Sequence, residues 1–299
     1  MANTLAAPVQ DKPARRFKFD QRYMYPMLAT AILVTGQISF KFLTSPVGTL
    51  MGVLAAIALE IVFSLIFVKK LPMLTSAYLS GISVGILVQA TTIWPYMFCA
   101  AVAILSKYLI RLDGRHIWNP SNLGIVTLLL VAPAYASTLG AQAGNNYVAI
   151  VGIWIVGFLT INRIKRFHIC FTYVVCFLGF AALRAFILGH YVPNESFMQE
   201  AAPITGPMYQ LFTFFMITDP KTTVKSWKGQ VLVAFLVAFV ENAFRMYGTL
   251  ASPPDGTLAN IVVTHAPYFA LTLMGPTALL LEIRSRRAAK RVALVVQQA

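Results

Sequence analysis

Long apolar segments occupy most of this chain and leave it few ways to fold. The stretches "IALEIVFSLIF" and "VLVAFLVAFV" belong to two of these segments. A helix needs about 20 apolar residues to cross the hydrocarbon core of a bilayer. Apolar residues make up 58% of the sequence and charged residues only 11%, whereas a soluble domain carries about 25% charged residues. The sequence therefore predicts an all-α, polytopic membrane protein.

Ten segments are candidates for membrane-spanning helices, and the fifth and the eighth are short. They lie at residues 24–43, 47–68, 72–90, 92–110, 121–136, 147–163, 168–189, 207–218, 229–248 and 258–283. No charged or Pro/Gly/Ser-rich linker separates them, so we expect one compact bundle. We therefore divide the chain into a basic N-terminal tail (1–22), a single transmembrane bundle (23–285) and a basic C-terminal tail (286–299).

The basic residues predict how the bundle lies in the membrane. All but three of the 24 Lys and Arg residues fall on one side of the ten predicted spans; the exceptions are Lys41, Arg184 and Arg245. Cytoplasmic loops carry the excess of Lys and Arg. The predicted location is therefore a bacterial-type inner membrane, with both termini on the cytoplasmic side. The first 22 residues show no apolar core with a cleavage site, and we expect no cleaved signal peptide. The net charge of +14 then reflects topology and attraction to anionic lipid, and it does not indicate nucleic-acid binding.

The sequence shows no pattern of metal ligands. Cys99, Cys170 and Cys176 all fall inside apolar segments without CxxC spacing, and the four histidines are scattered along the chain. Free cysteines of this kind pack as small hydrophobic residues. We also find no nucleophile elbow, phosphate-binding loop or dinucleotide-binding fingerprint. No metal site and no soluble-type catalytic residues are predicted.

Charged residues inside the predicted spans are candidates for function because a charge at the bilayer centre costs about 2.5–3.5 kcal/mol. Glu60 has no nearby partner in the sequence, and a functional role or a buried, hydrogen-bonded role would both explain it. Glu241 and Arg245 are four residues apart, so they can pair along one helix face; mutual neutralisation is the simpler interpretation. Glu282 at the end of the last span is expected to be a solvated or interfacial charge.

Two turns on the predicted cytoplasmic side resemble each other. They are "SKYLIRLDGRHIWNPSNLG" (106–124) and "FFMITDPKTTVKSWKG" (214–229), and each places an Asn-Pro or Asp-Pro step beside the membrane. Because the residue before proline is disfavoured in a helix, each step marks a break. The candidate site residues in these turns are Asn119, Pro120, Ser121, Thr218, Asp219, Pro220, Lys221, Thr222 and Thr223.

Two interpretations of these turns remain open. Ser121, Thr218 and Asp219 are suited to capping the next helix, and several basic residues, Arg115 among them, surround the turns. Opposed helix breaks in two halves of a bundle are also the way in which many transporters build a central site. Ordinary capping beside positive-inside lysines explains the same residues.

The two turns also carry a family resemblance. The stretch that ends in "GRHIWNPSNLG" and the stretch "LFTFFMITDPKTT" are similar to the Asn-Pro and Thr-Asp-Pro turns of the RnfD/NqrB family, over roughly residues 25–285. In length and in the form "FFMITDPKTT", the chain most resembles the UnbU-type branch encoded with enediyne biosynthesis genes. The resemblance implies ten transmembrane helices in two related halves, within complexes that couple electron transfer to sodium or proton movement.

The resemblance also implies a cofactor, and here the sequence departs from the family. Members of the RnfD/NqrB family typically carry FMN, which is esterified through its phosphate to the threonine of a Ser-Gly-Ala-Thr motif. The corresponding loop reads "APAYASTLGAQAGNNY" and contains Ser137, Thr138, Gly140 and Ala141 but no such motif. We therefore expect no covalent FMN, whereas a non-covalent flavin or quinone remains compatible with the supply of 21 Phe, 12 Tyr and 4 Trp.

Three functions follow as alternatives. The first is a redox-associated membrane subunit that works with other membrane or redox subunits. The second is a transporter of ions or small molecules on the same scaffold, and the third is a non-catalytic anchor for partner enzymes. The lipid bilayer is the expected surrounding in all three.

Overall fold

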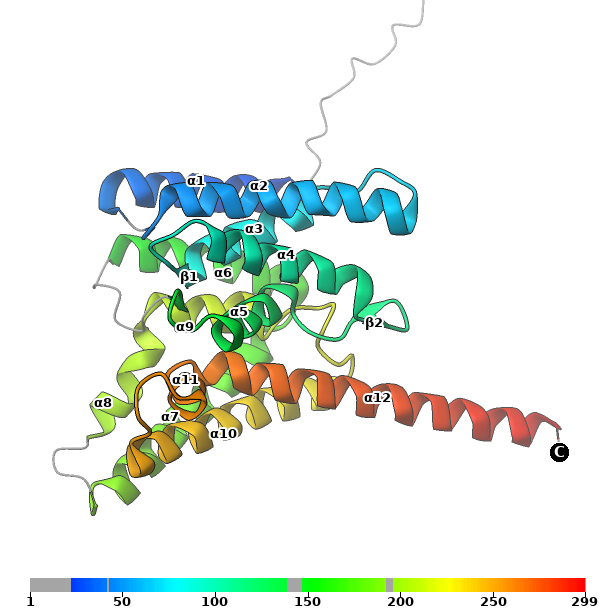
Figure 1. The fold of residues 1–299 in the computed structure, drawn as a ribbon. Helices are drawn as coiled ribbons and strands as arrows, with labels where there is room; N and C mark the ends of the chain where they lie inside the picture. Colours follow the sequence, from blue (N-terminus) through cyan, green and yellow to red (C-terminus); the bar gives the residue numbers. More distant parts are fainter. Residues whose placement is uncertain (1–22, 42, 139–146, 192–195, 299) are drawn as a thin grey trace, which may run out of the picture.

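The computed structural model describes residues 23–41, 43–138, 147–191 and 196–298, which form a predominantly helical bundle (Figure 1). The first part of the chain contains α1 (Met24–Phe40), α2 (Pro46–Phe63) with a π-helical end η1 (Ser64–Val68), α3 (Thr75–Leu87), α4 (Trp94–Leu109) and α5 (Pro120–Val131). The second part contains α6 (Tyr147–Ile164), α7 (Phe167–Leu188), α8 (Phe197–Ala201), the 3-10 turn η2 (Ala202–Thr205), α9 (Pro207–Leu211) with a π-helical end η3 (Phe212–Met216), α10 (Trp227–Ala251), α11 (Leu258–Thr264) and α12 (Ala266–Gln298).

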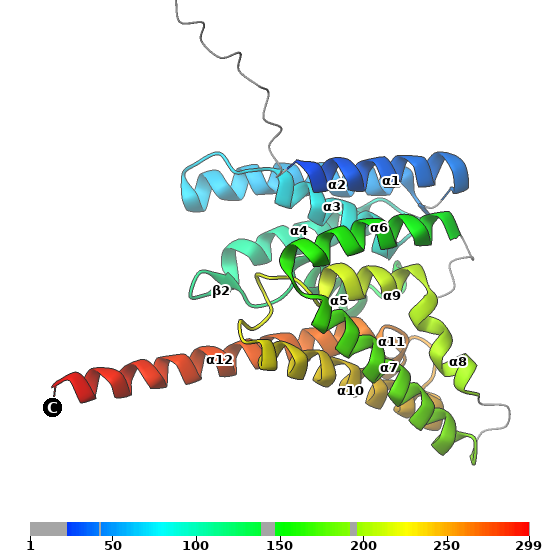
Figure 2. The same cartoon turned by 180° about the vertical axis from the view of Figure 1, so that it is seen from behind.

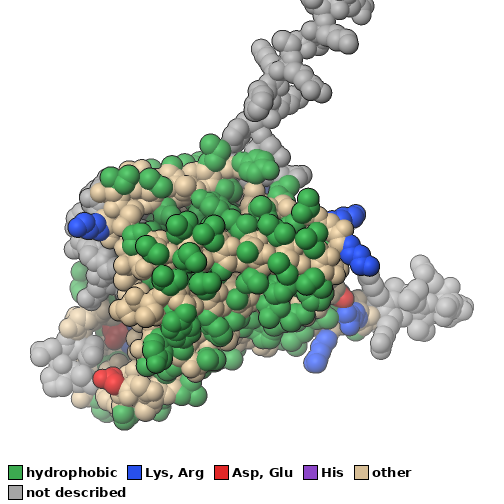
Figure 3. All heavy atoms as spheres, turned by 45° about the horizontal axis from the view of Figure 1, so that its top comes forward, with side chains coloured by type: hydrophobic (Ala, Val, Ile, Leu, Met, Phe, Trp, Pro, Cys, Tyr) green, Lys and Arg blue, Asp and Glu red, His purple; other side chains and the backbone are tan. Residues whose placement is uncertain are grey.

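Two short antiparallel strand pairs lie at opposite ends of the bundle. The strands β2 (Arg111–Leu112) and β3 (Arg115–His116) form a hairpin after α4. The strands β1 (Val88–Gln89) and β4 (Ser137–Thr138) join the end of α3 to the segment after α5. We call the end that carries the β2–β3 hairpin the basic end, because Lys and Arg side chains gather there (Figure 3).

The helices run roughly along one direction and stack in layers. α1 and α2 lie along one edge and α10 and α12 along the other, with α4, α5 and α9 between them in both views (Figures 1 and 2). The main core is built from α3, α4, α5, α7, α9, α10 and α12. Apolar side chains cover the middle of the face seen in Figure 3, as expected for a protein whose surroundings are lipid.

The prediction of a helical membrane protein is confirmed in its coarse form. Among the described residues, four helices are long and apolar enough to cross a membrane: Pro46–Val68, Phe167–Leu188, Trp227–Ala251 and Ala266–Ala289. Shorter apolar helices include Thr75–Leu87, Pro120–Val131 and Ile150–Ile164. These helices indicate a multi-pass membrane protein, while the number of ten spans and the orientation of the termini stay predictions.

The last predicted span differs from the structure in its interior and at its C-terminal end. It is broken at His265, where α11 ends and α12 begins, and α12 continues without interruption to Gln298. The predicted boundary at residue 285 therefore lies inside one helix, which extends beyond the rest of the bundle in both views (Figures 1 and 2).

Close packing of α2 against α3 depends on two glycines spaced four residues apart. A Cβ atom on Gly81 would lie 2.6 Å from the Cα of Val53, and one on Gly85 would clash with Thr49. Thr49 Oγ1 also donates a hydrogen bond of 3.1 Å to Gly85 O. Small residues at this spacing let helix backbones approach each other in a membrane, and here they bring α2 and α3 together.

Candidate functional site

The two predicted turns meet at the basic end of the bundle. Asn119 Nδ2 donates a hydrogen bond of 3.3 Å to Asp219 Oδ2, although the two residues are 100 positions apart. Asn119 stands directly before α5, and Asp219 follows η3. The structure thus brings the Asn-Pro turn and the Asp-Pro turn into direct contact, and we call this region the two-turn site.

The helix caps differ from the sequence prediction. Asn119 is the N-cap of α5, and its Oδ1 accepts from Asn122 N at 3.1 Å; Ser121 lies inside the helix and is buried. The next helix after Asp219 is α10, and its N-cap is Ser226. The prediction that Ser121, Thr218 and Asp219 cap the following helices is therefore wrong. Pro120 takes the first position of α5, where a missing N–H costs least, and Pro220 follows Asp219 in the turn.

Asp219 instead organises a local turn. Its Oδ1 accepts a hydrogen bond from Lys221 N at 2.9 Å, and its Oδ2 accepts one from Thr222 Oγ1 at 3.2 Å. The hydroxyl of Thr223 donates to Asp219 O at 2.7 Å. Thr218 is buried and donates from its hydroxyl to Phe214 O at 2.5 Å. The hydroxyls predicted as site residues are thus committed to holding the turn in shape, and the Asp219 carboxylate faces α5.

Two arginines from other elements hold the backbone of this turn. Arg115 in β3 donates to Pro220 O at 3.4 Å and to Thr223 O. Arg166, between α6 and α7, donates to Thr218 O at 3.5 Å. From the sequence, Arg115 is named among the basic residues around the two turns, but Arg166 is not singled out. Each guanidinium offers five N–H donors. It can therefore bind backbone carbonyl groups of a non-helical segment, which have no helical N–H partner.

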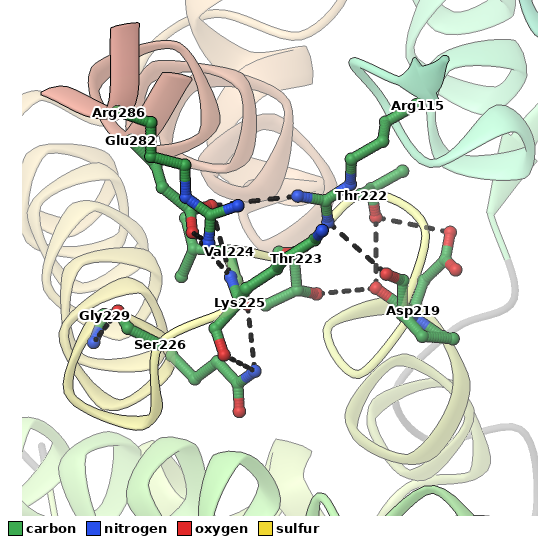
Figure 4. A network of polar contacts seen from close by, with 12 residues as sticks. Arg115, Asp219, Thr222, Thr223, Val224, Lys225, Ser226, Gly229, Glu282 and Arg286 are labelled. Atoms are coloured by element: carbon green, nitrogen blue, oxygen red, sulfur yellow. Dashed lines mark hydrogen bonds and ion pairs between the residues drawn. The ribbon is translucent and has the colours of Figure 1, made fainter. Parts of the chain in front are cut away.

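Glu282 in α12 connects that helix to the same segment (Figure 4). Both of its carboxylate oxygens lie 3.1 Å from Lys225 N. Its Oε2 also lies 3.7 Å from Arg115 Nη1, and its Oε1 lies 2.5 Å from Arg286 Nη2. The Glu282 side chain is only 13% exposed. Glu282 is therefore not a fully solvated charge, because it is largely buried and accepts the backbone N–H group of Lys225; the alternative of an interfacial charge stays a prediction.

A second link joins α5 to α12 behind the two-turn site. Asn122 Nδ2 donates to Tyr268 O at 3.1 Å and to Thr272 Oγ1 at 2.7 Å. Trp118 Nε1 donates to Thr272 O at 2.9 Å. Asn122 is 1% exposed, and its Oδ1 has no hydrogen-bond partner among the described residues. A buried, unpaired amide oxygen next to the turn is the kind of acceptor that a bound polar ligand or water would use.

The electrostatic setting of the site is dominated by burial. Desolvation raises the pKa of the Asp219 carboxyl, against the opposing effects of its hydrogen bond from Lys221 N and of the nearby cations. Desolvation and the positive charges of Lys221, Arg111 and Lys107 lower the pKa of His116 to about 4. His116 is therefore neutral at physiological pH, and its Nδ1 has no partner among the described residues.

Glu60 is not isolated, because helix α4 supplies its partners. Lys107 Nζ lies 3.6 Å from Glu60 Oε2, and Tyr108 Oη donates to Glu60 Oε1 at 2.9 Å. Lys107 also donates to Ser76 O and Ser76 Oγ at 3.3 and 3.2 Å. Glu60 and Lys107 are both buried. A paired, buried charge of this kind lowers its own insertion cost, so the partners on α4 account for the burial of Glu60.

Glu241 and Arg245 form the predicted pair within a larger network. Arg245 Nε lies 3.0 Å from Glu241 Oε1. Tyr173 and Tyr209 donate to the two carboxylate oxygens of Glu241 at 2.6 and 2.5 Å. Nearby, Arg184 pairs with Glu200 at 2.6 Å and is 1% exposed. The predicted pair is therefore present, but the prediction missed the hydroxyl groups of Tyr173 and Tyr209, which also donate hydrogen bonds to Glu241.

The segment where the family carries its flavin is partly described. Ser137 and Thr138, which the sequence places in a loop, form β4 and pair with β1. Thr138 is buried and shares a hydrogen bond of 2.8 Å with His265 Nδ1. Gly140 and Ala141 lie outside the described residues. Within the described part of the chain, no group of three His, Cys, Asp or Glu side chains could hold a metal ion.

The two-turn site can bind a polar edge of a ligand and hold a charge. It combines amide donors and acceptors, a half-buried carboxyl and several cations on a rigid frame. No nucleophile with an adjacent base appears among its described residues.

Comparisons with known proteins agree with this description in part. No family model matches the chain. The chain is 30% identical over 147 residues to a component of the ion-translocating oxidoreductase complex of Erwinia tasmaniensis. The matched segment covers 47% of this chain and 39% of that protein's length. Over less than half its length, this chain is therefore similar to one subunit of an ion-translocating oxidoreductase complex.

Proposed function

We propose that this chain is a multi-pass membrane subunit of an electron-transport complex of the RnfD/NqrB type, with other membrane or redox subunits as partners. The partial similarity to an ion-translocating oxidoreductase component and the long apolar helices support this assignment. The gathering of Lys and Arg at one end (Figure 3) supports a placement in a bacterial inner membrane with that end in the cytoplasm.

The contact between Asn119 and Asp219 is the observation that carries the proposal for the site. It joins the two turns that resemble the family into one polar surface at the end of an apolar core. Asn119 and Asp219 hold this surface in shape through their own hydrogen bonds, and Asn122 Oδ1 is an unpaired acceptor there that the N–H of a flavin ring could use. A few polar groups on an apolar frame are the common lining of a cofactor site. The proposed ligand is accordingly a non-covalently bound flavin or quinone.

Covalent FMN is not part of the proposal. The motif for its attachment is missing from the sequence. The Thr138 hydroxyl would also have to leave its hydrogen bond with His265 and its buried position before it could carry a phosphate ester. In a denaturing gel, we expect no fluorescent protein band.

The test is purification of the full chain in mild detergent from cells supplied with riboflavin. A flavin absorption band that acid denaturation releases, or quinone in the organic extract, would support the proposal. Asp219→Asn and Asn119→Ala should lower the bound cofactor, whereas Asp255→Asn, at an exposed turn residue of the other end, should not. A preparation with neither cofactor and without co-purifying redox subunits would contradict it.

A second candidate function is transport of an ion or small molecule on the same scaffold, which the UnbU-like resemblance also allows. The buried pairs Glu60–Lys107 and Glu241–Arg245 favour it, because intramembrane charges often mark a substrate pathway. Uptake of a substrate by vesicles that contain the colourless protein would support transport. An anchor for partner enzymes would instead retain those enzymes at the membrane without cofactor or uptake.

A further inference from the structure

The cations around the 218–223 turn outnumber the carboxylates that could neutralise them. Arg115 and Arg166 both donate to backbone carbonyls of this turn, and Lys221 is part of it. The acidic side chains at this place are Asp219 within the turn and Glu282, which accepts from Lys225 N just after it. Arg111 and His116 are paired across the β2–β3 hairpin beside Arg115, and Arg111 adds to the positive side of this balance.

Among these cations, the charge of Arg166 is the least neutralised by carboxylates. It is half-buried, yet it forms no ion pair with a carboxylate of the described residues. Its hydrogen bond to Thr218 O is long, at 3.5 Å. Burial and the charge of Arg115 lower the pKa of Arg166, while Asp219 raises it. A partly desolvated guanidinium with few of its donors used is costly unless an anion completes its shell.

Lys221 supplies a second free cation at the same place. Its backbone N–H is held by Asp219 Oδ1 at 2.9 Å, which fixes the position of its Cα. Its side chain is exposed, and its ammonium group makes no hydrogen bond or ion pair within the described ranges. Arg115 is different, because Glu282 lies 3.7 Å from its guanidinium and offsets its charge.

We propose that Arg166 and Lys221, with Arg115 beside them, bind a phosphate group at the 218–223 turn. Arginine recognises phosphate through two parallel N–H···O bonds, and lysine binds it as a point charge. The group could belong to a small ligand, as in FMN, or to the headgroup of an anionic lipid, since both present the same chemistry. The preference for FMN over riboflavin rests on the proposed function; the binding of a phosphate does not.

Ordinary positive-inside lysines explain Lys221 alone but not Arg166. A residue that serves only topology stays in solvent, as Lys69 and Lys70 do at the end of η1. Arg166 instead lies against the turn that carries Asp219, and the hairpin and α12 hold that turn from its other sides. The Arg166 guanidinium and the backbone of Lys221 are thus held on a fixed frame, which is what a specific site needs.

The experiment compares two flavins that differ by the phosphate alone. Full-length protein in phosphate-free detergent buffer is titrated with FMN and with riboflavin, and flavin fluorescence is recorded. We expect FMN to bind about tenfold more tightly, because charge-assisted hydrogen bonds are worth that much. Inorganic phosphate should compete with FMN, and added salt should weaken FMN binding more than riboflavin binding.

Variants assign the effect to residues. Arg166→Gln and Lys221→Gln should each bring the affinity for FMN close to that for riboflavin, while Lys70→Gln, at an exposed lysine of another element, should keep the difference. Should Arg166→Gln fail to fold, Lys221→Gln retains the test, because the Lys221 side chain is exposed. Equal affinity of the wild type for both flavins would exclude FMN as the source of the phosphate and leave the proposed function standing; the lipid arm below then decides whether the site binds phosphate at all.

A second arm separates a lipid headgroup from a small ligand. The thermal midpoint of the protein is measured in nanodiscs of phosphatidylglycerol and of phosphatidylcholine. One outcome is that phosphatidylglycerol stabilises the wild type, that Arg166→Gln and Lys221→Gln lose this stabilisation, and that neither flavin binds. This outcome would support the phosphate site and count against the proposed cofactor. Absence of any effect of FMN, inorganic phosphate and phosphatidylglycerol would overturn the inference.

Discussion

Both carboxylate oxygens of Glu282 lie 3.1 Å from the backbone nitrogen of Lys225, 57 residues earlier in the chain. One side chain of α12 thereby holds the segment that runs from Asp219 to the start of α10. Because Glu282 also faces Arg115, which donates to Thr223 O, the position of α12 is coupled to the shape of the two-turn site (Figure 4).

Glu282→Gln should loosen this segment. The change removes the charge that strengthens the bond to Lys225 N, and hydrogen bonds to charged groups contribute about 1.5–3 kcal/mol. We expect a lower thermal midpoint and faster tryptic cleavage after Lys221 or Lys225. Arg286→Gln is the control, because Arg286 is 49% exposed and such pairs contribute about 0–1 kcal/mol. Equal cleavage rates in the wild type and Glu282→Gln would contradict the prediction.

Tyr173→Phe should destabilise the helix packing between α7 and α10. It removes the 2.6 Å hydrogen bond to Glu241 and leaves a buried carboxylate oxygen without that donor. The expected cost is about 1–3 kcal/mol, measured as a shift in the denaturant or thermal midpoint in detergent. Tyr247→Phe is the matched control on α10, since Tyr247 is exposed. If both variants shift the midpoint equally, the network around Glu241 is not stabilising.

The local features of this molecule could be predicted from its sequence. Apolar runs marked most of the helices, and the i, i+4 spacing of Glu241 and Arg245 predicted their pairing. The steps Asn119–Pro120 and Asp219–Pro220 marked the two breaks. In each case the signal lies within a few residues, where backbone sterics and helix geometry determine the result.

The contacts that build the candidate site could not be predicted in the same way. Asn119 meets Asp219 across 100 residues, and Asn122 meets Thr272 across 150. These pairs depend on how the helices pack, which hydropathy alone does not specify. The cap of α5 is instructive: Asn119 and Ser121 are both good capping residues, and Pro120 makes Asn119 the one with extended backbone.

Gly85→Leu should separate α2 from α3. No side chain fits at this position, because a Cβ would already clash with Thr49, which also donates to Gly85 O. Overpacking of this kind costs about 1–3 kcal/mol or more, and we expect reduced yield and a lower thermal midpoint. Gly179→Leu is the control on α7, where a Cβ would meet nothing within 4 Å. A stable Gly85→Leu protein would show that the two helices can move apart freely.

Stability should depend on pH through His116. Its pKa is about 4 in the folded protein, below the ordinary value of 6.5, because of burial and of the cations Lys221, Arg111 and Lys107. The unfolded chain therefore takes up a proton first as the pH falls. The stabilisation is fully present above about pH 6.5 and is lost toward pH 4, at no more than about 1.4 kcal/mol per pH unit.

The comparison of His116→Asn with the wild type isolates this effect. Asp219 acts in the opposite direction, because its raised pKa favours the folded protein as the pH falls, and it is unchanged in the variant. Between pH 7.5 and pH 5, the thermal midpoint should therefore drop less in His116→Asn than in the wild type. His190→Asn, at an exposed histidine just after α7, should behave like the wild type. If the thermal midpoint of His116→Asn drops as much as that of the wild type, then His116 is protonated in the folded state or open to solvent. The cationic surroundings of the two-turn site would then be weaker than the structure indicates.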